Sequence, residues 1–172
     1  MQTLPKSKAS SPSSTSKVKI HSIGIAGMKV VEAPERVSTV LGSCIGIALY
    51  DRVKKVGGMA HIILPDSREG SGDPAKFADT AVEMLLEQLI EAGAERKRVT
   101  AKIAGGAKMF GSGSNAGKLG ERNADAVKER LRALAIRLAG EAVGGNKGRK
   151  MCLDPATGDV LVNVIGQEGK VM

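Results

Sequence analysis

The sequence predicts an α/β sandwich of the α+β class, in which mixed β-sheets pack with two main helices. Short apolar runs rich in Val and Ile, separated by glycines and turn residues, predict more strands than helices. Only two stretches have helical spacing, and neither joins a regular series of parallel strands, so a mixed sheet is favoured over a doubly wound fold. The length of 172 residues corresponds to one domain with an extension.

The folded domain is expected to begin at residue 17. Residues 1–16 contain six serines, two prolines and almost no large apolar side chains. Burial therefore cannot offset the conformational entropy that these residues would lose on ordering. We expect a disordered extension at 1–16 and a single domain at 17–172.

Three strands are expected first, and the two helices lie among the strands that follow. Asp73 as N-cap and Pro74 at the first helical position begin a helix that Gly93 ends. A second amphipathic helix is expected over residues 119–135. The predicted strands are residues 18–27, 38–51, 55–65, 98–107, 136–143, 150–154 and 159–166.

Composition argues against nucleic acid and membranes as partners. The net charge is +8, but Lys6, Lys8, Lys17 and Lys19 near the start of the chain supply half of it. Only one Tyr and two Phe are present, which gives no platform for stacking bases. No apolar stretch reaches the length of a membrane span, and the N-terminus lacks a signal-peptide pattern, so we expect a cytoplasmic protein with no membrane insertion.

The sequence predicts neither a metal site nor a cofactor site. The glycine-rich loop near residue 113 does not match a phosphate-binding loop, and its partial dinucleotide-binding pattern does not directly follow a strand. Two cysteines without a C-x-x-C pair fit a reducing compartment. No two of the four possible soft ligands have metal-ligand spacing: His21, Cys44, His61 and Cys152.

The most informative feature is Cys44, followed seventeen residues later by His61. If residues 38–51 and 55–65 form a hairpin with a turn centred at Arg52–Val53, Cys44 and His61 are direct cross-strand neighbours on one face. The imidazole could then take the thiol proton and make Cys44 a thiolate nucleophile. The alternative is that both residues only pack in the core, as single Cys and His residues in strands often do.

Residues around Cys44 could complete a catalytic site. Gly42 and Gly46 would leave room for a substrate beside the sulfur, and backbone N–H groups near Ser43 and Cys44 could form an oxyanion hole. A Cys–His pair also needs a group that orients the imidazole, and Ser38 and its neighbour Thr39 offer hydroxyls just upstream.

The chain resembles the CheD family of chemoreceptor glutamine deamidases. The resemblance lies in LGSCIGIALYD, GGMAHIILPDS, KFADTAVEMLLEQL, AKIAGGAKMF, LGERNADAVKERL and GGNKGR, which occur in this order. It implies an α/β sandwich and a cysteine hydrolase that converts glutamine side chains of methyl-accepting chemoreceptors to glutamate without a cofactor. It also implies Cys44 as the nucleophile, His61 as the base, and Ser38 as the orienting residue in place of the family's threonine.

The resemblance implies two partners, the cytoplasmic domains of chemoreceptors and a CheC-type phosphatase. Phe110 and the glycine-rich loop around it are the expected surface for the phosphatase. Two alternatives stay open at this point: an adaptor that binds these partners with little turnover, and another cysteine hydrolase or transglutaminase that uses the same pair on a different acyl donor.

Overall fold

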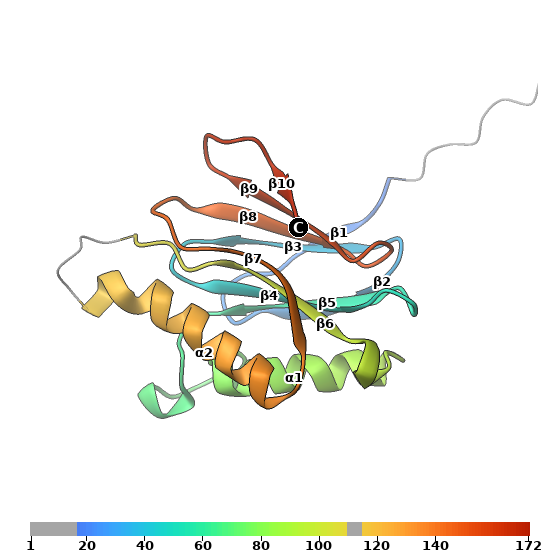
Figure 1. Cartoon of the computed structure of the whole chain (residues 1–172), viewed down its shortest axis with the longest axis horizontal. Helices are drawn as coiled ribbons and strands as arrows, with labels where there is room; N and C mark the ends of the chain where they lie inside the picture. The colour runs from blue at the N-terminus through green and yellow to red at the C-terminus, as the bar shows by residue number, and fades with distance from the viewer. Residues whose placement is uncertain (1–16, 110–114) are drawn as a thin grey trace, which may run out of the picture.

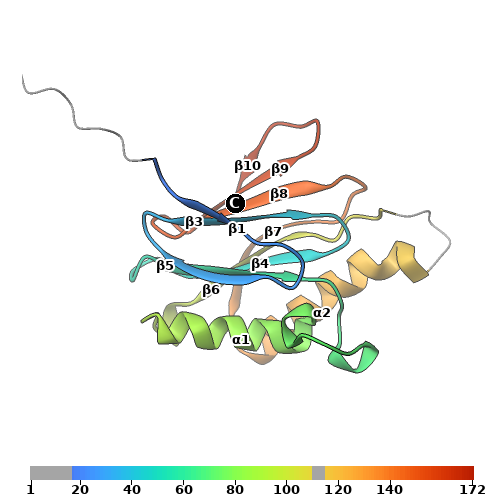
Figure 2. The same cartoon turned by 180° about the vertical axis from the view of Figure 1, so that it is seen from behind.

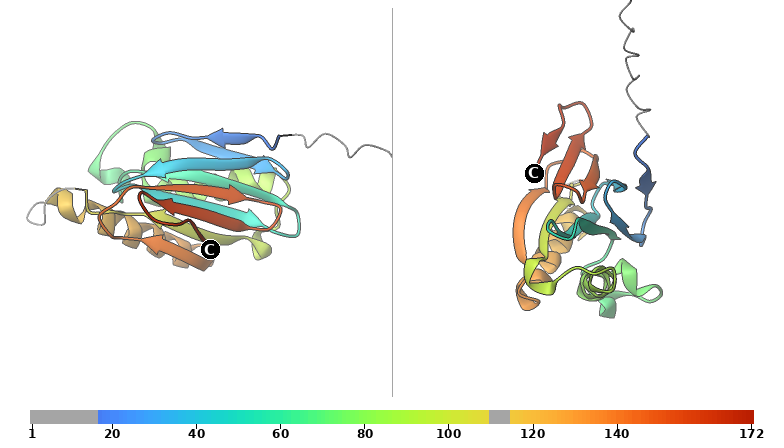
Figure 3. Two further views of the ribbon diagram at one scale, coloured as in Figure 1. Left: turned by 90° about the horizontal axis from the view of Figure 1, so that it is seen from above. Right: turned by 90° about the vertical axis from the view of Figure 1, so that its right-hand side faces the viewer.

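The computed structural model describes residues 17–109 and 115–172 as two stacked β-sheets with helices on one side. The helices cover the outer face of one sheet only, so the layers run sheet, sheet, helices (Figure 1, Figure 2). The end-on view in Figure 3 separates the three layers. The predicted extension at 1–16 lies outside the described residues.

The first sheet has five strands in the order β1-β3-β8-β9-β10. Its β1 and β3 are parallel and its other pairs are antiparallel. The strands are β1 (Ile20–Ser22), β3 (Arg36–Leu41), β8 (Arg149–Asp154), β9 (Asp159–Val164) and β10 (Lys170–Val171).

The second sheet also has five strands, in the order β2-β5-β4-β6-β7. Its β6 and β7 are parallel and its other pairs antiparallel, so both sheets are mixed and the predicted α+β sandwich is confirmed. The strands are β2 (Met28–Glu32), β4 (Ile45–Asp51), β5 (Val56–Ile62), β6 (Thr100–Gly105) and β7 (Arg137–Val143).

Two helices, α1 (Ala78–Glu91) and α2 (Leu119–Ala133), pack against the second sheet. Asp73 accepts a hydrogen bond from the Ala75 N–H, as an N-cap does, but it caps a short 3-10 turn rather than α1 itself. The four 3-10 turns are η1 (Ser67–Glu69), η2 (Pro74–Lys76), η3 (Arg96–Arg98) and η4 (Asn115–Lys118). Among the described residues, no helix is long and apolar enough to cross a bilayer.

The second sheet is buried on both faces, and each face belongs to a different core. Alternate residues of β4, such as Ile47 and Leu49, pack with the helices, whereas Ala48 and Tyr50 face the first sheet. This alternation decides which side chains of β4 and β5 meet the first sheet. The candidate residues His61 and Cys44 are on that inner face.

The predicted strand at 38–51 is two strands in different sheets. Strand β3 ends at Leu41 and pairs with β8, whereas β4 begins at Ile45 and pairs with β5 and β6. Residues 42–44 carry the chain from one sheet to the other. The predicted strand at 18–27 is likewise wrong in extent, because β1 ends at Ser22 and the chain turns before it enters β2 in the second sheet.

Candidate active site

Cys44 and His61 lie on one face of the β4–β5 hairpin, at the end of the sandwich. His61 is opposite Gly46 in the observed register, and Cys44 is two residues before Gly46. The two residues are therefore diagonal neighbours between the sheets, rather than directly opposite as the predicted turn implied. Cys44 packs against the core between the two sheets, and His61 meets Thr39 in the same space, so both side chains lie on the inner side of the second sheet.

The register differs from the prediction because the hairpin turn has four residues, with Asp51 paired to Val56. The buried Asp51 carboxylate accepts hydrogen bonds from the Val53 and Lys54 N–H groups, at 3.0 and 3.1 Å, and the Lys55 N–H donates to the Asp51 carbonyl. These bonds close a longer turn than the two-residue one that was expected.

The Nδ1 atom of His61 is 2.8 Å from the Thr39 hydroxyl, in the buried space between the sheets. The same hydroxyl donates to the carbonyl of Ile23 at 2.9 Å. A hydroxyl has one hydrogen, so Thr39 can only accept from His61, and Nδ1 must carry the imidazole proton. The Nε2 atom is then the basic nitrogen, and it has no hydrogen-bond partner among the described residues.

The residue that meets His61 is Thr39, not Ser38. Both side chains are buried, but neighbours on a strand point to opposite faces, and only Thr39 faces the second sheet. Ser38 is paired with Ser22 and Cys152 within the first sheet. The structure thus corrects the expected orienting residue by one position.

Burial favours the uncharged forms of both reacting groups. It raises the pKa of the Cys44 thiol, an effect that a hydrogen bond from the residue's own backbone opposes, and it lowers the pKa of His61. Both directions favour an uncharged thiol and an uncharged imidazole, whereas the sequence led us to expect a thiolate.

The linker that carries Cys44 is held by hydrogen bonds to the carbonyl groups of its three residues, 42–44. The Ala107 N–H donates to Gly42 at 2.9 Å, the Gly106 N–H donates to Cys44 at 2.8 Å, and the Asn123 side-chain amide donates to Ser43 at 3.2 Å. The N–H groups of Ser43 and Cys44 donate to no backbone carbonyl within the described part of the chain. That these N–H groups bind an oxyanion stays a prediction.

The two glycines beside Cys44 have different surroundings from those expected. A Cβ atom at Gly46 would meet Met151 Sδ at 2.8 Å and Leu41 Cδ1 at 2.9 Å, so core packing rather than substrate requires this glycine. At Gly42 the neighbour is the side chain of Met109, which is 47% exposed. Only Gly42 lies beside an exposed side chain that a substrate could contact.

Asn123 was missed from the sequence, although a signal was present. It lies four and eight residues before Val127 and Leu131, two buried residues of α2, so it is a polar residue on the apolar face of a helix. It is completely buried, and its Nδ2 atom also lies 3.0 Å from the carbonyl of Ile63.

Other predicted residues are not part of this cluster. Cys152 is half-buried in β8, and His21 pairs with Glu35 at 2.6 Å. Phe110 lies outside the described residues. Within residues 17–109 and 115–172, no group of three or more His, Cys, Asp or Glu side chains could hold a metal ion.

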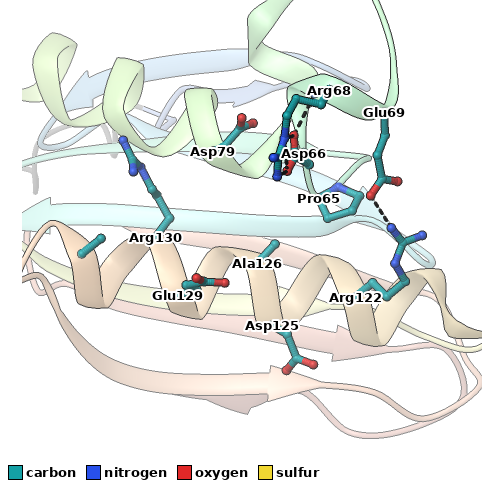
Figure 4. Close-up of a pocket in the computed structure, with 11 residues that line it drawn as sticks. Pro65, Asp66, Arg68, Glu69, Asp79, Arg122, Asp125, Ala126, Glu129 and Arg130 are labelled. Atoms are coloured by element: carbon teal, nitrogen blue, oxygen red, sulfur yellow. Dashed lines mark hydrogen bonds and ion pairs between the residues drawn. The ribbon is translucent and has the colours of Figure 1, made fainter.

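A separate groove lies between α1 and α2 and is lined mainly by charged side chains (Figure 4). Arg122 pairs with Glu69 across it, and Arg68 pairs with Asp66. Neither Cys44 nor His61 lines this groove. It is not the reaction site that the Cys–His pair defines.

Comparison with known proteins identifies the family of this chain. Residues 63–164 match the family model described as CheD chemotactic sensory transduction. The chain is 50% identical over 156 residues to the probable chemoreceptor glutamine deamidase CheD of Moorella thermoacetica, with 87% of this chain and 93% of the relative covered. The chain belongs to the CheD family. A CheD relative of the same description from Methanococcus vannielii is 46% identical, with 85% of this chain and 92% of the relative covered.

One solved structure has a distant likeness to this CheD-family chain. The crystal structure of Neisseria meningitidis protein NMB0706 matches with a TM-score of 0.46 and 9% identity, covering 75% of this chain and 64% of the other. The matched CheD family model begins after Cys44 and His61, so the match does not cover the pair.

Proposed function

We propose that this protein deamidates glutamine side chains on the cytoplasmic domains of methyl-accepting chemoreceptors. The observation that carries the proposal is the His61 imidazole, whose Nδ1 proton is bound by Thr39 so that Nε2 is left as a base on the face that Cys44 shares. The CheD relatives, described as probable chemoreceptor glutamine deamidases, supply the substrate class.

The first half of the reaction forms a thioester and releases ammonia. The Cys44 sulfur attacks the side-chain carbonyl carbon of glutamine while Nε2 of His61 takes the thiol proton. The N–H groups of Ser43 and Cys44 bind the oxyanion of the tetrahedral intermediate. The imidazolium then gives its proton to the amide nitrogen, the C–N bond breaks, and ammonia leaves.

The second half restores the enzyme. Neutral His61 takes a proton from water as the water oxygen attacks the thioester carbon, and the imidazolium returns a proton to sulfur when the C–S bond breaks. The products are glutamate and the free Cys44 thiol. Every atom and proton is balanced by glutamine and water, so the chemistry requires no cofactor.

The geometry also gives Thr39 a role in this scheme. By accepting from Nδ1, it holds the tautomer in which Nε2 can act as the base, and its own bond to Ile23 keeps the hydroxyl in place. Thr39 is therefore a positioning residue. Binding of a CheC-type phosphatase through Phe110 stays a prediction.

Mass spectrometry of a chemoreceptor cytoplasmic fragment tests the proposal. Incubation with the wild-type protein should convert selected glutamines to glutamate, a gain of about one dalton each. Cys44→Ala should abolish the gain, and Cys152→Ala is the matched control that should preserve it. No gain with folded wild-type protein would contradict the enzyme and favour an adaptor, whereas amine incorporation in place of hydrolysis would indicate a transglutaminase.

A further inference from the structure

Asn123 joins the two segments that carry the nucleophile and the base. Its Nδ2 atom lies 3.2 Å from the carbonyl oxygen of Ser43, the residue before Cys44, and 3.0 Å from the carbonyl oxygen of Ile63, two residues after His61. A side-chain amide has two N–H hydrogens, so this pair of bonds uses both of them. One side chain of α2 thus connects the Cys44 linker to the end of β5.

The bond to Ser43 also determines the direction of a backbone donor. The Ser43 carbonyl and the Cys44 N–H belong to one planar trans peptide unit and point in opposite directions. When Asn123 draws the Ser43 oxygen toward α2, the Cys44 N–H must point away from α2. This N–H has no backbone acceptor among the described residues and is a candidate oxyanion donor.

Among the hydrogen bonds that hold the linker, the one from Asn123 orients the peptide unit of Ser43 and Cys44. The carbonyls of Gly42 and Cys44, on either side of Ser43, are bound by backbone N–H groups of Ala107 and Gly106. Within the described structure, only the central carbonyl is bound by a side chain, and it belongs to the peptide unit whose N–H is the candidate oxyanion donor.

The burial of Asn123 indicates a role beyond packing. Asn123 is completely buried on a helix face that is otherwise apolar at Ala124, Val127 and Leu131, and its Oδ1 atom has no donor among the described residues. A buried acceptor without a partner is unfavourable, and an apolar side chain would avoid that cost. The two carbonyl contacts account for an asparagine at this position.

We propose that Asn123 is a positioning residue that fixes the Cys44 linker relative to the end of β5 that carries His61 and aims the Cys44 N–H at the oxyanion. This inference deepens the proposed deamidation and depends on it for its kinetic consequence. Asn123 does not touch the glutamine, and it acts only through the Ser43 and Ile63 carbonyls.

The test compares Asn123→Asp and Asn123→Ala with Asn163→Asp. Asn123→Asp keeps the shape but replaces the two donors by acceptors, and Asn123→Ala removes them without adding a charge. Asn163 is exposed in β9 and is the matched control for the same chemical change. All variants are made in full-length protein that also carries Cys152→Ala, so that Cys44 is the only thiol.

Two readouts separate positioning from structural support. For deamidation of a receptor fragment, kcat should fall about 10²-fold in both Asn123 variants while KM stays within about threefold, because misplacement of reacting groups affects the chemical step. The rate of Cys44 alkylation by iodoacetamide, followed against pH, should shift to higher pH, because the Cys44 N–H no longer supports the thiolate. Asn163→Asp should leave both unchanged.

Wild-type kcat and an unshifted alkylation profile in folded Asn123→Asp or Asn123→Ala would overturn the inference. So would a loss of kcat that matches the unfolded fraction measured by thermal melting, because that is the result of structural support alone. If the wild-type protein itself does not deamidate the receptor fragment, the proposed function fails. The alkylation profile then still decides whether Asn123 positions Cys44.

Discussion

Replacement of Thr39 by valine should disable the base while leaving the fold intact. The two side chains have nearly the same shape, but valine cannot accept from His61 Nδ1 or donate to the Ile23 carbonyl, contacts that are 2.8 and 2.9 Å long. The His61 contact is fully buried, so the stranded Nδ1 hydrogen should lower the free energy of unfolding by about 1–3 kcal/mol. Ile23 is only half-buried, and water can replace its lost bond.

The effect on the reaction should exceed the effect on stability. Without Thr39, the imidazole is free to turn and to place its proton on Nε2, where it can no longer take the thiol proton. We expect kcat for receptor deamidation to fall about 10²-fold in Thr39→Val, measured by mass spectrometry under conditions where the variant is folded. Thr39→Ser keeps the hydroxyl and should recover most of the rate.

Ser38→Ala is the matched control because Ser38 is the adjacent residue and points to the other face of β3. Its kcat should stay within about threefold of the wild-type value, since Ser38 has no contact with His61. A larger loss in Ser38→Ala than in Thr39→Val would refute the assignment and restore Ser38 as the orienting residue.

Three further predictions concern pH, the hairpin turn and the Cys44 linker. Burial lowers the pKa of His61, so its neutral, basic form should persist below pH 6.5 and the acidic limb of the kcat–pH profile should lie below that pH. An acidic limb above pH 7 would contradict the assignment of His61 as the base. Burial alone would raise the pKa of Asp51, but hydrogen bonds from Arg98 and from backbone N–H groups outweigh it and lower the pKa to about 2. The stability that Asp51 contributes should therefore be complete above pH 4 and lost as the pH falls toward 2. Chemical denaturation of Asp51→Asn should show a loss of about 2 kcal/mol in the free energy of unfolding at pH 7, and this loss should disappear in acid. Gly105 and Gly144 both have positive φ values, 111° and 85°, but a Cβ at Gly105 would overlap the Cys44 carbonyl whereas nothing lies within 4 Å at Gly144. Gly144→Ala should lower the free energy of unfolding by about 1 kcal/mol, and Gly105→Ala by at least twice as much. Equal losses in denaturant titrations would show that the linker is not held as described.

Local patterns predicted the elements whose own residues determine them. The apolar spacing of α1 and α2 and the turn at Asp73–Pro74 depend on neighbours in sequence, and these features were predicted within a few residues. The start of α1 is an exception: the helix was expected to begin at Pro74, whereas α1 begins at Ala78 after a 3-10 turn. Helix ends depend on tertiary packing as well as periodicity.

The division of residues 38–51 between two sheets could not be predicted from apolar content. Both halves are strand-like, and the change of sheet depends on distant partners: Leu41 pairs with Arg149, whereas Ile45 pairs with Ile62 and Gly105. Hydrophobic alternation gives the faces of a strand but not the sheet to which it belongs.

The sequence pattern gives the faces of a strand but not its partners, and this also limited the prediction of the site. The two-residue period of strands led us to expect Cys44 and His61 on one side of the sheet, and both side chains lie between the two sheets although the register differs by two. The choice between Ser38 and Thr39 required knowing which face of β3 meets β5. Asn123 could have been noticed as a polar residue on an apolar helix face, but the carbonyls it binds are 80 and 60 residues away in sequence.

Trapping the covalent intermediate tests the central claim most directly. Wild-type protein and a glutamine-containing receptor fragment are mixed, quenched with acid within the first turnover, digested and analysed by mass spectrometry, with hydroxylamine treatment to cleave thioesters. The account predicts a receptor peptide attached to the peptide that contains Cys44, released by hydroxylamine and absent from Cys44→Ser. Undiminished deamidation by Cys44→Ser, or an adduct on Cys152 instead, would contradict it.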